Sequence, residues 1–442
     1  MFGTDGIRGL ANADLTPELS FKLGRAAGAL LQEPGQKSAM VVGRDTRLSG
    51  SMLEAALVAG ICSAGVDVYL AGVIPTPAVA YLARTMDICA GVVISASHNP
   101  APDNGIKFFN HQGFKLDDAL EEKIEQLILG DLNDLPRPTG RDLGSIIPLP
   151  DAQERYVHFL KSLVKQPLTG MKIVVDCAHG AAFEVAPRVF RELGAQVISL
   201  FDLPNGTNIN DGCGSTHPGA LQEAVIKYGA HLGIAHDGDA DRVLAVDEQG
   251  QLVDGDQILV ICGLALQKEK ILGGKVVVTV MSNLGLKQAF EANGIEVLET
   301  KVGDRFVLEK MVESGAILGG EQSGHIIFLQ HNTTGDGVLT ALQLVQVLRE
   351  SGQPLSQLAG QMKTFPQVLV NVRVKSKAGW EENSRIRAAI NEGENALQGK
   401  GRLFVRASGT ESLIRVMAEG PNQEELQKIT AEVARIVAME LE

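Results

Sequence analysis

Aromatic residues are scarce in this chain of 442 residues, where tryptophan, tyrosine and phenylalanine together make up 4%. A surface that stacks nucleic-acid bases needs exposed aromatic rings, so the composition argues against one. Positive charge is also in deficit, because 53 acidic residues outweigh 40 lysines and arginines and give a formal net charge of -13. Such a chain repels nucleic acid and anionic membranes, so we expect neither as a partner.

Cysteine is rare, and its five copies are scattered without a Cys-x-x-Cys pair. An odd number of thiols leaves one unpaired, which favours a reduced, cytoplasmic location. The first residues have neither the basic start nor the apolar run of a signal peptide. The longest apolar stretch, residues 55–66, is interrupted by glycines and is shorter than the roughly 20 residues that span a bilayer.

Apolar residues, in contrast, make up 45% of the chain, and glycine occurs 49 times. A globular chain of this length predicts about three or four domains. The many glycines predict tight turns, some of them close to bound ligands.

One arrangement of strands and helices occurs three times. Each copy is predicted to run strand, helix, strand, helix, strand, and then to open into a polar loop. The predicted elements are 37–42, 52–64, 67–70, 78–85 and 90–94 in the first copy, 171–176, 183–193, 197–200, 220–228 and 232–235 in the second, and 275–280, 284–292, 296–299, 305–314 and 316–318 in the third.

This alternation predicts an α/β fold with three similar βαβ-type, mixed-sheet domains. The last part differs, because residues 367–374 alternate apolar and polar and a helix is followed by two strands and a final helix, which predicts a smaller α+β domain. Ligands of open α/β sheets bind beyond the carboxyl ends of strands, so we expect the polar loops to meet in one central cleft. The predicted domains are residues 1–150, 151–250, 251–365 and 366–442.

Three carboxylates, Asp237, Asp239 and Asp241, stand at alternate positions directly after a strand. Like charges this close repel unless a cation lies among them, and Mg²⁺ prefers such oxygen ligands. An EF-hand is the alternative, since Glu248 is at the twelfth position, but Arg242 stands where that loop needs glycine. An acidic surface turn is the other alternative.

Ser97 follows an apolar strand and precedes His98. A lone serine in a loop usually caps or turns the chain. Lys107 lies close behind it in the sequence, however, and the acidic loop would supply a metal ion. A hydroxyl beside Mg²⁺ and a lysine is a plausible phosphoryl acceptor, because phosphoryl transfer requires mainly positioning and charge neutralisation.

Polar residues also alternate after the third copy, at Glu321, Ser323 and His325. An extended segment would place these side chains on one face, where the first two suit sugar hydroxyls and the histidine could act as a base or bind phosphate. A polar turn is the alternative for this segment.

Arginine and hydroxyl groups gather in a short segment between two strands near the C-terminal end. Arg415 could add charge there, and a plain hairpin is the alternative. The composition is typical of a phosphate-binding loop, and its candidates are Arg406, Ser408, Gly409 and Thr410. Two further loops, at residues 3–9 with Arg8 and 43–47 with Arg44 and Arg47, place arginine in segments that contain glycine. A salt-bridged surface turn is the alternative for each, and it fits the second equally well.

Together these motifs resemble the α-D-phosphohexomutase superfamily over the whole chain and in the expected order. Ser-Ala-Ser-His-Asn-Pro around Ser97 is similar to the family's phosphoserine motif, and the three aspartates followed by Arg242 resemble its Mg²⁺ loop. Residues 320–325 resemble its sugar-specificity loop and residues 406–412 its phosphate-binding loop. Residues 208–215 look like the branch that acts on glucosamine.

The resemblance implies a mutase that interconverts glucosamine 6-phosphate and glucosamine 1-phosphate through phosphorylated Ser97 and a 1,6-bisphosphate, feeding UDP-N-acetylglucosamine synthesis. It implies one Mg²⁺ per subunit on Ser97 and the three aspartates, and it is compatible with a homodimer. Lys107 and Arg8 would neutralise the transferring group, and His325 or a nearby base would take the hydroxyl proton. The substrate would be bound by Arg242, Glu321, Ser323, Arg406, Ser408, Gly409, Thr410 and Arg415.

Three other functions are weighed against this one. A phosphomannomutase or phosphoglucomutase would share the same motifs, although Gln322 and residues 208–215 favour the amino sugar. A non-catalytic phosphosugar-binding protein would be expected to lose Ser97 or an aspartate, and all are present. A Mg²⁺-dependent phosphatase would need neither the sugar loop nor the phosphate loop.

Overall fold

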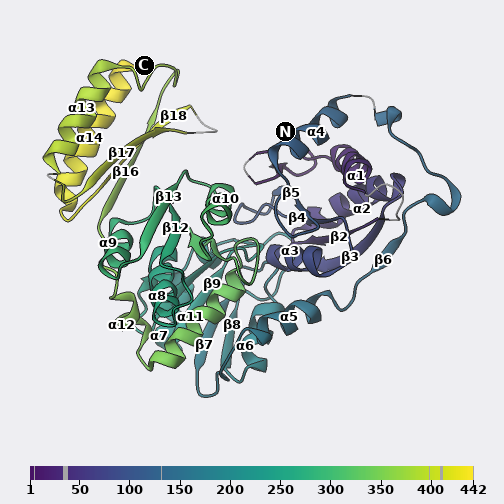
Figure 1. The fold of residues 1–442 in the computed structure, drawn as a ribbon, viewed down its shortest axis with the longest axis horizontal. Coiled ribbons are helices and arrows are strands. Elements are labelled where there is room, and N and C mark those ends of the chain that lie inside the picture. Colours follow the sequence, from purple (N-terminus) through teal and green to yellow (C-terminus); the bar gives the residue numbers. More distant parts are fainter. Residues whose placement is uncertain (4, 33–37, 131, 398, 409–411, 442) are drawn as a thin grey trace. The chain divides into compact units, whose positions relative to one another are not determined.

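The computed structural model describes residues 1–3, 5–32, 38–130, 132–397, 399–408 and 412–441. The chain divides into a larger unit, residues 1–281 with 293–361, and a smaller unit, residues 282–292 with 362–442. The larger unit holds three sheets and the smaller unit holds one (Figure 1). Within the described ranges, no helix is both long enough and apolar enough to cross a membrane.

The first sheet has six strands in the order β1-β5-β4-β2-β3-β6. Strands β2, β3, β4 and β6 are parallel, whereas β5 runs antiparallel between β4 and β1. Its core is built from side chains such as Val42, Val92 and Leu57, all fully buried. The elements are β1 (Ile7–Leu10), α1 (Pro17–Leu31), β2 (Ala39–Arg44), α2 (Leu48–Ser63), β3 (Asp67–Val73), α3 (Thr76–Thr85), β4 (Ala90–Ile94), β5 (Asp103–Asn110), α4 (Asp118–Leu129) and β6 (Ile146–Pro148).

The second sheet has the order β11-β10-β9-β7-β8, in which β10 runs antiparallel to both of its neighbours, β9 and β11, and the other strands share one direction. Helix α7 ends where Gly229 takes a left-handed conformation, with φ 54°, which glycine adopts at little cost. The elements are α5 (Ala152–Ser162), β7 (Lys172–Asp176), α6 (Val185–Glu192), β8 (Gln196–Leu200), α7 (Gly219–Tyr228), β9 (Leu232–His236), β10 (Val243–Asp247) and β11 (Leu252–Val253).

The third sheet has the order β13-β12-β14-β15, and β15 is antiparallel to β14. Helix α8 begins with a capping box, in which the Asp254 carboxylate accepts from the main-chain N–H of Gln257 and the Gln257 side chain accepts in return. The elements are α8 (Gly255–Lys268), β12 (Lys275–Thr279), β13 (Glu296–Thr300), α10 (Asp304–Ser314), β14 (Leu318–Gly320), β15 (Ile326–Phe328), α11 (Gly337–Ser351) and α12 (Leu355–Ala359).

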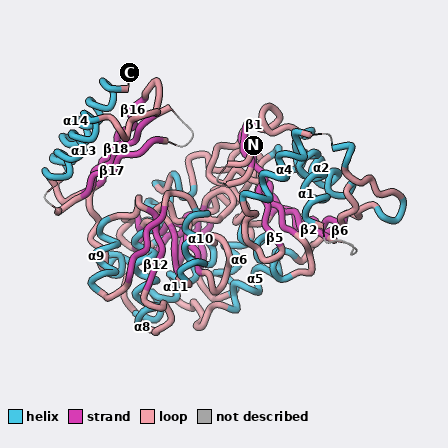
Figure 2. The backbone as a smooth tube through the Cα atoms, turned by 45° about the horizontal axis from the view of Figure 1, so that its top comes forward, coloured by secondary structure: helices cyan, strands magenta, loops and turns pink. Residues whose placement is uncertain are grey.

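The smaller unit contains an antiparallel sheet in the order β16-β18-β17. Helices α13 and α14 lie along one face of it, where their apolar side chains form a core with the strands (Figure 2). Helix α9 joins this unit through the N–H of Leu284, which donates to the Glu419 carboxylate at 2.8 Å. The elements are α9 (Leu284–Ala292), β16 (Gln367–Arg373), α13 (Ser384–Ala396), β17 (Arg402–Ala407), β18 (Leu413–Glu419) and α14 (Gln423–Glu440). Three short 3₁₀ turns, at 132–134, 140–142 and 214–216, complete the described secondary structure.

The predicted fold class is confirmed: the larger unit has three mixed α/β sheets and the smaller unit is the expected α+β part. Strand β4 and helix α9 have the predicted bounds. The mixed character comes from β5, β10 and β15, which return antiparallel after each polar loop.

Candidate functional site

The loops after β4 and β9 meet in the larger unit, although Ser97 and Asp237 are 140 residues apart in the chain. Ser97 Oγ donates to Asp237 Oδ2 at 2.6 Å, and both side chains are buried. The predicted nucleophile and the predicted metal loop are therefore in direct contact. Parallel strands deliver both loops at their carboxyl ends, as the sheet topology requires.

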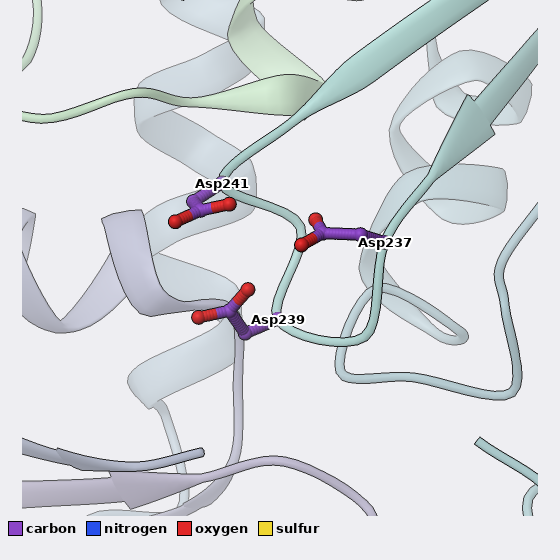
Figure 3. A group of neighbouring side chains, drawn as sticks. All are labelled: Asp237, Asp239 and Asp241. Atoms are coloured by element: carbon purple, nitrogen blue, oxygen red, sulfur yellow. The ribbon is translucent and has the colours of Figure 1, made fainter. Parts of the chain in front are cut away.

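The three aspartates of the β9–β10 loop turn their carboxylates toward one another (Figure 3). One oxygen from each lies within 4.8 Å of the others, and the residues are at most 5% exposed. Oδ1 of Asp239 and Oδ1 of Asp241 are buried, and neither is hydrogen bonded to a described residue. Oxygen donors at this spacing, two of them with unused lone pairs, fit a small hard cation such as Mg²⁺.

Electrostatics in the loop agree with a cation-binding role. Burial, followed by the charges of Asp241 and Asp239, raises the pKa of Asp237 well above its ordinary value. Burial also acts on Asp241, but the hydrogen bond and charge of His325 outweigh it, with help from Lys107, and hold its pKa far below normal. A divalent cation would relieve the repulsion between these carboxylates.

Lys107 lies among the carboxylates and is 2% exposed. Its Nζ is 2.9 Å from Asp5 Oδ2, 3.1 Å from Asp239 Oδ2 and 3.9 Å from Asp241 Oδ2. Burial opposes the charge on Lys107, but these carboxylates outweigh it and raise the lysine pKa. Arg8 pairs with Asp5 and reaches Asn99 Oδ1 at 3.5 Å, so both predicted cations lie at the serine loop.

His325 also contacts the acidic loop, with Nδ1 3.5 Å from Asp241 Oδ2. Its Nε2 accepts from the main-chain N–H of Gly335 at 3.1 Å, so both ring nitrogens have neighbours. Burial lowers the pKa of His325, but the hydrogen bond and charge of Asp241 outweigh it and raise the value. To act as a base, the ring would have to release one of these contacts.

The expectation of an extended segment at residues 321–325 is wrong. The N–H of Gly324 donates to the carbonyl of Glu321 at 3.0 Å, and Gly324 has φ 91°, so the chain turns tightly between β14 and β15. The three polar side chains consequently do not share one face: His325 is buried and Ser323 is exposed. The polar turn, weighed as the alternative, is the observed structure.

Glu321 and Ser323 remain near each other on this turn, with Ser323 Oγ 3.4 Å from Glu321 Oε2. The other Glu321 oxygen accepts from the N–H of Gly303 at 3.0 Å. Arg242 is half-buried, and its Nε lies 3.8 Å from Asp241 Oδ1. Gln322 donates to Asp254 Oδ2 at 3.1 Å and so helps to cap α8.

The loop at residues 43–47 is not a salt-bridged surface turn. Asp45 and Arg47 are buried, at 0% and 1% exposure, and Arg47 Nε donates to Asp45 Oδ2 at 2.9 Å. Arg47 also donates to main-chain carbonyls of the serine loop, including that of Ser97 at 3.0 Å. Arg47 therefore acts in the protein interior, where it contacts the backbone of the predicted nucleophile.

The predicted phosphate loop lies in the smaller unit, where Gly409 and Thr410 are outside the described residues. Arg406 on β17 stands directly opposite Arg415 on β18. Burial and then the charge of Arg415 lower the pKa of Arg406. Lys377 adds a third cation by donating to the carbonyl of the buried Ser408 at 2.6 Å. Opposed like charges destabilise a strand pair, and an anion would relieve that repulsion.

A cavity of about 380 Å³ in the larger unit borders His325. Apolar side chains form much of its wall, and Lys115 and Asp304 bring charge to it. Lys115 Nζ pairs with carboxylates of both Asp5, in the turn before β1, and Asp304, the first residue of α10. Sequence reasoning missed Asp5, Lys115 and Asp304 as site residues: Asp5 lies in the loop at residues 3–9, which was noted only for Arg8, and Lys115 and Asp304 lie outside every motif that was singled out.

Sequence profiles described as alpha/beta/alpha domains I, II and III of phosphoglucomutase/phosphomannomutase match residues 1–133, 154–250 and 254–365. The profile described as the C-terminal domain of the same family matches residues 369–436.

Full-length relatives carry one name. The phosphoglucosamine mutase of Desulforamulus reducens is 60% identical over 438 residues, covering 99% of this chain and 99% of its own. The phosphoglucosamine mutase of Pelotomaculum thermopropionicum is 59% identical, covering 99% of this chain and 98% of its own.

Among solved structures, a phosphoglucomutase/phosphomannomutase family protein from Burkholderia thailandensis matches with a TM-score of 0.82 and 26% identity, covering 99% of this chain and 98% of that one. The Aspergillus fumigatus N-acetylphosphoglucosamine mutase, solved with GlcNAc-6P and magnesium, matches with a TM-score of 0.73 over 100% of this chain and 96% of that one. At 19% identity this second likeness bears on the fold alone.

Proposed function

Since this chain belongs to the phosphoglucomutase/phosphomannomutase family, the α-D-phosphohexomutase superfamily, we propose that it interconverts glucosamine 6-phosphate and glucosamine 1-phosphate. The amino sugar is the preferred substrate because the full-length relatives at 60% and 59% identity are phosphoglucosamine mutases. The product would supply UDP-N-acetylglucosamine synthesis.

One observation carries the reaction type: Ser97 Oγ lies 2.6 Å from Asp237 within a buried group of three carboxylates, beside Lys107. A hydroxyl in this setting can carry a phosphoryl group, because the oxygens of that group would face a lysine and a cation site. A binding protein has no need for such a nucleophile.

Ser97, Asp237, Asp239 and Asp241 would hold Mg²⁺, one ion per subunit. When bound, the ion supplies positive charge to the oxygens of the phosphoryl group that transfers. Buried oxygens of Asp239 and Asp241 that accept no hydrogen bond from the described part of the chain support this assignment.

Transfer begins from Ser97 in its phosphorylated form. The bond between Ser97 Oγ and phosphorus breaks as the bond from substrate O1 to phosphorus forms; the O1 proton passes to His325 or a neighbouring base, and the leaving Ser97 Oγ takes up a proton. Lys107 and Arg8 neutralise the charge on the moving group, which their distances to the carboxylate cluster support. The product of this half-reaction is glucosamine 1,6-bisphosphate.

The bisphosphate then reverses its orientation, and Ser97 Oγ takes the 6-phosphoryl group and gives up its hydroxyl proton while O6 receives a proton. Glucosamine 1-phosphate leaves, and the phosphoserine is restored. Glu321 and Ser323 would bind the sugar hydroxyls, with Arg242 beside them. Arg406, Ser408, Gly409, Thr410 and Arg415 would hold the phosphate that does not react, and the opposed arginines support this.

Domain boundaries near residues 150, 250 and 365, the cytoplasmic location and the homodimer stay predictions. We also propose that Ser97 must be phosphorylated for activity. Addition of a hexose 1,6-bisphosphate should activate the purified protein and increase its mass by one phosphoryl group at Ser97.

A coupled assay with Mg²⁺ tests the proposed substrate. Glucosamine 6-phosphate, glucose 1-phosphate and mannose 1-phosphate are compared at equal concentration, with free phosphate measured in parallel. A large preference for the amino sugar is expected. Preference for a hexose would assign the chain to the phosphomannomutase or phosphoglucomutase branch, and net release of phosphate would identify a phosphatase instead.

A further inference from the structure

Ser97 has an unusual backbone conformation, with φ 53°. Residues other than glycine, asparagine and aspartate rarely adopt this left-handed region, and the surrounding structure must hold them there. The direction of Ser97 Oγ toward Asp237 depends on that backbone, so the groups that hold it bear on the chemistry.

The side chains of Arg47 and Asn210 donate hydrogen bonds to main-chain carbonyls of the serine loop, the segment after β4 that contains Ser97 and Asn99. Arg47 Nη2 donates to the carbonyls of Ser97 at 3.0 Å and Asn99 at 2.8 Å, and Nη1 reaches those of Pro100 and Asp103. The same two carbonyls of Ser97 and Asn99 accept from Asn210 Nδ2, at 2.9 and 3.0 Å. Arg47 comes from the first sheet region, whereas Asn210 comes from the loop that follows β8 in the second.

Asn210 is built into this place. It is 8% exposed and has φ 59°, a conformation that asparagine tolerates better than most residues. Gly238 of the acidic loop packs against the same point, because a Cβ there would come within 2.5 Å of the Ser97 carbonyl and 2.8 Å of Asn210 Nδ2. The serine loop, the acidic loop and residue 210 therefore pack without space between them.

We propose that Asn210 is a positioning residue for phosphoryl transfer, which fixes the Ser97 loop against the acidic loop through the carbonyls of Ser97 and Asn99. This inference rests on the proposed function. It also gives Asn210, which lies in the segment 208–215 taken from the sequence as a sign of the amino-sugar branch, a role toward the nucleophile rather than toward the sugar. Asn210 acts through Ser97, so its loss should lower kcat and leave the KM for the phosphosugar nearly unchanged.

Two substitutions separate the hydrogen bonds from the backbone shape. Asn210→Asp keeps the size and the tolerance of left-handed φ, but it places a carboxylate against two carbonyl oxygens. Asn210→Gly keeps the backbone freedom and removes the donor. Asn12 is the matched control, because it also has left-handed φ, at 63°, while its side chain is exposed. Asn12→Asp and Asn12→Gly therefore repeat both chemical changes away from the serine loop.

Steady-state rates, melting temperature and backbone hydrogen exchange of residues 96–103 are measured on all four variants and the parent. We expect kcat to fall about ten- to a hundredfold in Asn210→Asp, since lost donors and a misplaced nucleophile cost this much, with a smaller loss in Asn210→Gly. Exchange of residues 96–103 should accelerate in both, and the Asn12 variants should match the parent. If Asn210→Asp does not fold, Asn210→Gly decides the question.

Rates and exchange in the Asn210 variants that equal those of the Asn12 variants would overturn the inference. A rise in KM at unchanged kcat would also overturn it, because it would place Asn210 at the substrate. A parent protein without mutase activity would defeat the proposed function instead, and the exchange of residues 96–103 would still decide whether Asn210 holds the loop.

Discussion

The two units hold charged groups in opposite ways. In the larger unit, the carboxylates of Asp239, Asp241 and Asp5 surround the buried Lys107, so that opposite charges are interleaved at 2.9 to 3.9 Å. In the smaller unit, Arg406 and Arg415 face each other on neighbouring strands, and like charges are opposed.

The difference indicates different tasks. Interleaved charges fix the position of every group before the substrate arrives, which is what a transferring phosphoryl group requires. Opposed cations on a strand pair gain most when an anion lies between them, which suits a loop that must take and release a phosphate. The first arrangement should therefore govern kcat, and the second should govern binding.

Replacing the nucleophile Ser97 should have the largest effect on the site in the larger unit, where the charges are interleaved. Ser97→Ala deletes the hydroxyl that donates to Asp237 at 2.6 Å, and no other atom takes its place. We expect mutase activity to fall by about 10⁴-fold or more, because losing a covalent nucleophile leaves only binding and electrostatic contributions. The coupled assay measures the rate, and the variant should melt near the parent temperature.

Ser51→Ala is the control for this change. Ser51 is exposed on α2, so this substitution also removes a serine hydroxyl, but outside the site. Turnover within severalfold of the parent in Ser97→Ala would contradict the phosphoserine proposal.

Neutralising one carboxylate should have a smaller effect on the same arrangement. Asp239→Asn keeps an oxygen for the hydrogen bond from Thr76 Oγ1, which is 2.7 Å long, but removes the charge that faces Lys107 and the metal site. The Mg²⁺ concentration for half-maximal activity should rise at least about tenfold, since changes even beyond the direct ligands cost that much in metal affinity. Titration of EDTA-treated protein with Mg²⁺ measures it.

Asp247→Asn is the matched control, because Asp247 is also buried and lies at the far end of β10, where it accepts from the N–H groups of Gln249 and Gln251. An unchanged Mg²⁺ requirement in Asp239→Asn would exclude this residue as a ligand.

The sequence was most informative where chemistry is local. Alternating aspartates directly after a strand, and a serine after another, were sufficient to predict that Asp237 and Ser97 meet, because each loop follows the carboxyl end of a strand in its own sheet and such polar loops were expected to meet in one cleft. The bounds of β4 follow from its uninterrupted apolar run. Strand β5 was missed because it begins with Asp103, Asn104 and Gly105, residues that favour turns, and antiparallel pairing with β4 decides its conformation.

Long-range contacts could not be predicted in this way. Nothing in the segment around Asn210 indicates that its amide meets the carbonyl of Ser97, 113 residues earlier in the chain. The tight turn at residues 321–324 was only the alternative to an extended segment, because alternation of polar residues occurs in both, and Gly324 with φ 91° sets the direction of the chain. Tertiary packing supplies this information, and a single segment does not contain it.

The opposed arginines of the smaller unit, Arg406 and Arg415, give the prediction with the smallest expected loss of activity. Arg406→Gln removes one of two opposed guanidinium groups, so the phosphate should bind about tenfold to a hundredfold more weakly, as expected for a lost charged hydrogen bond. The effect should appear in KM for glucosamine 6-phosphate, with kcat changed less, because Ser97 and Lys107 are untouched.

The same substitution, Arg406→Gln, should increase the stability of the protein although it weakens phosphate binding. With one arginine gone, the repulsion across β17 and β18 disappears, and the free energy of unfolding should rise by about 0.2–1 kcal/mol at low salt and by less at high salt. Arg435→Gln is the control in the same unit: it breaks an exposed ion pair with Glu432 on α14 and should change neither KM nor stability measurably. If Arg406→Gln lowered kcat and left KM unchanged, the smaller unit would take part in the chemistry, and the division of tasks between the two regions would be wrong.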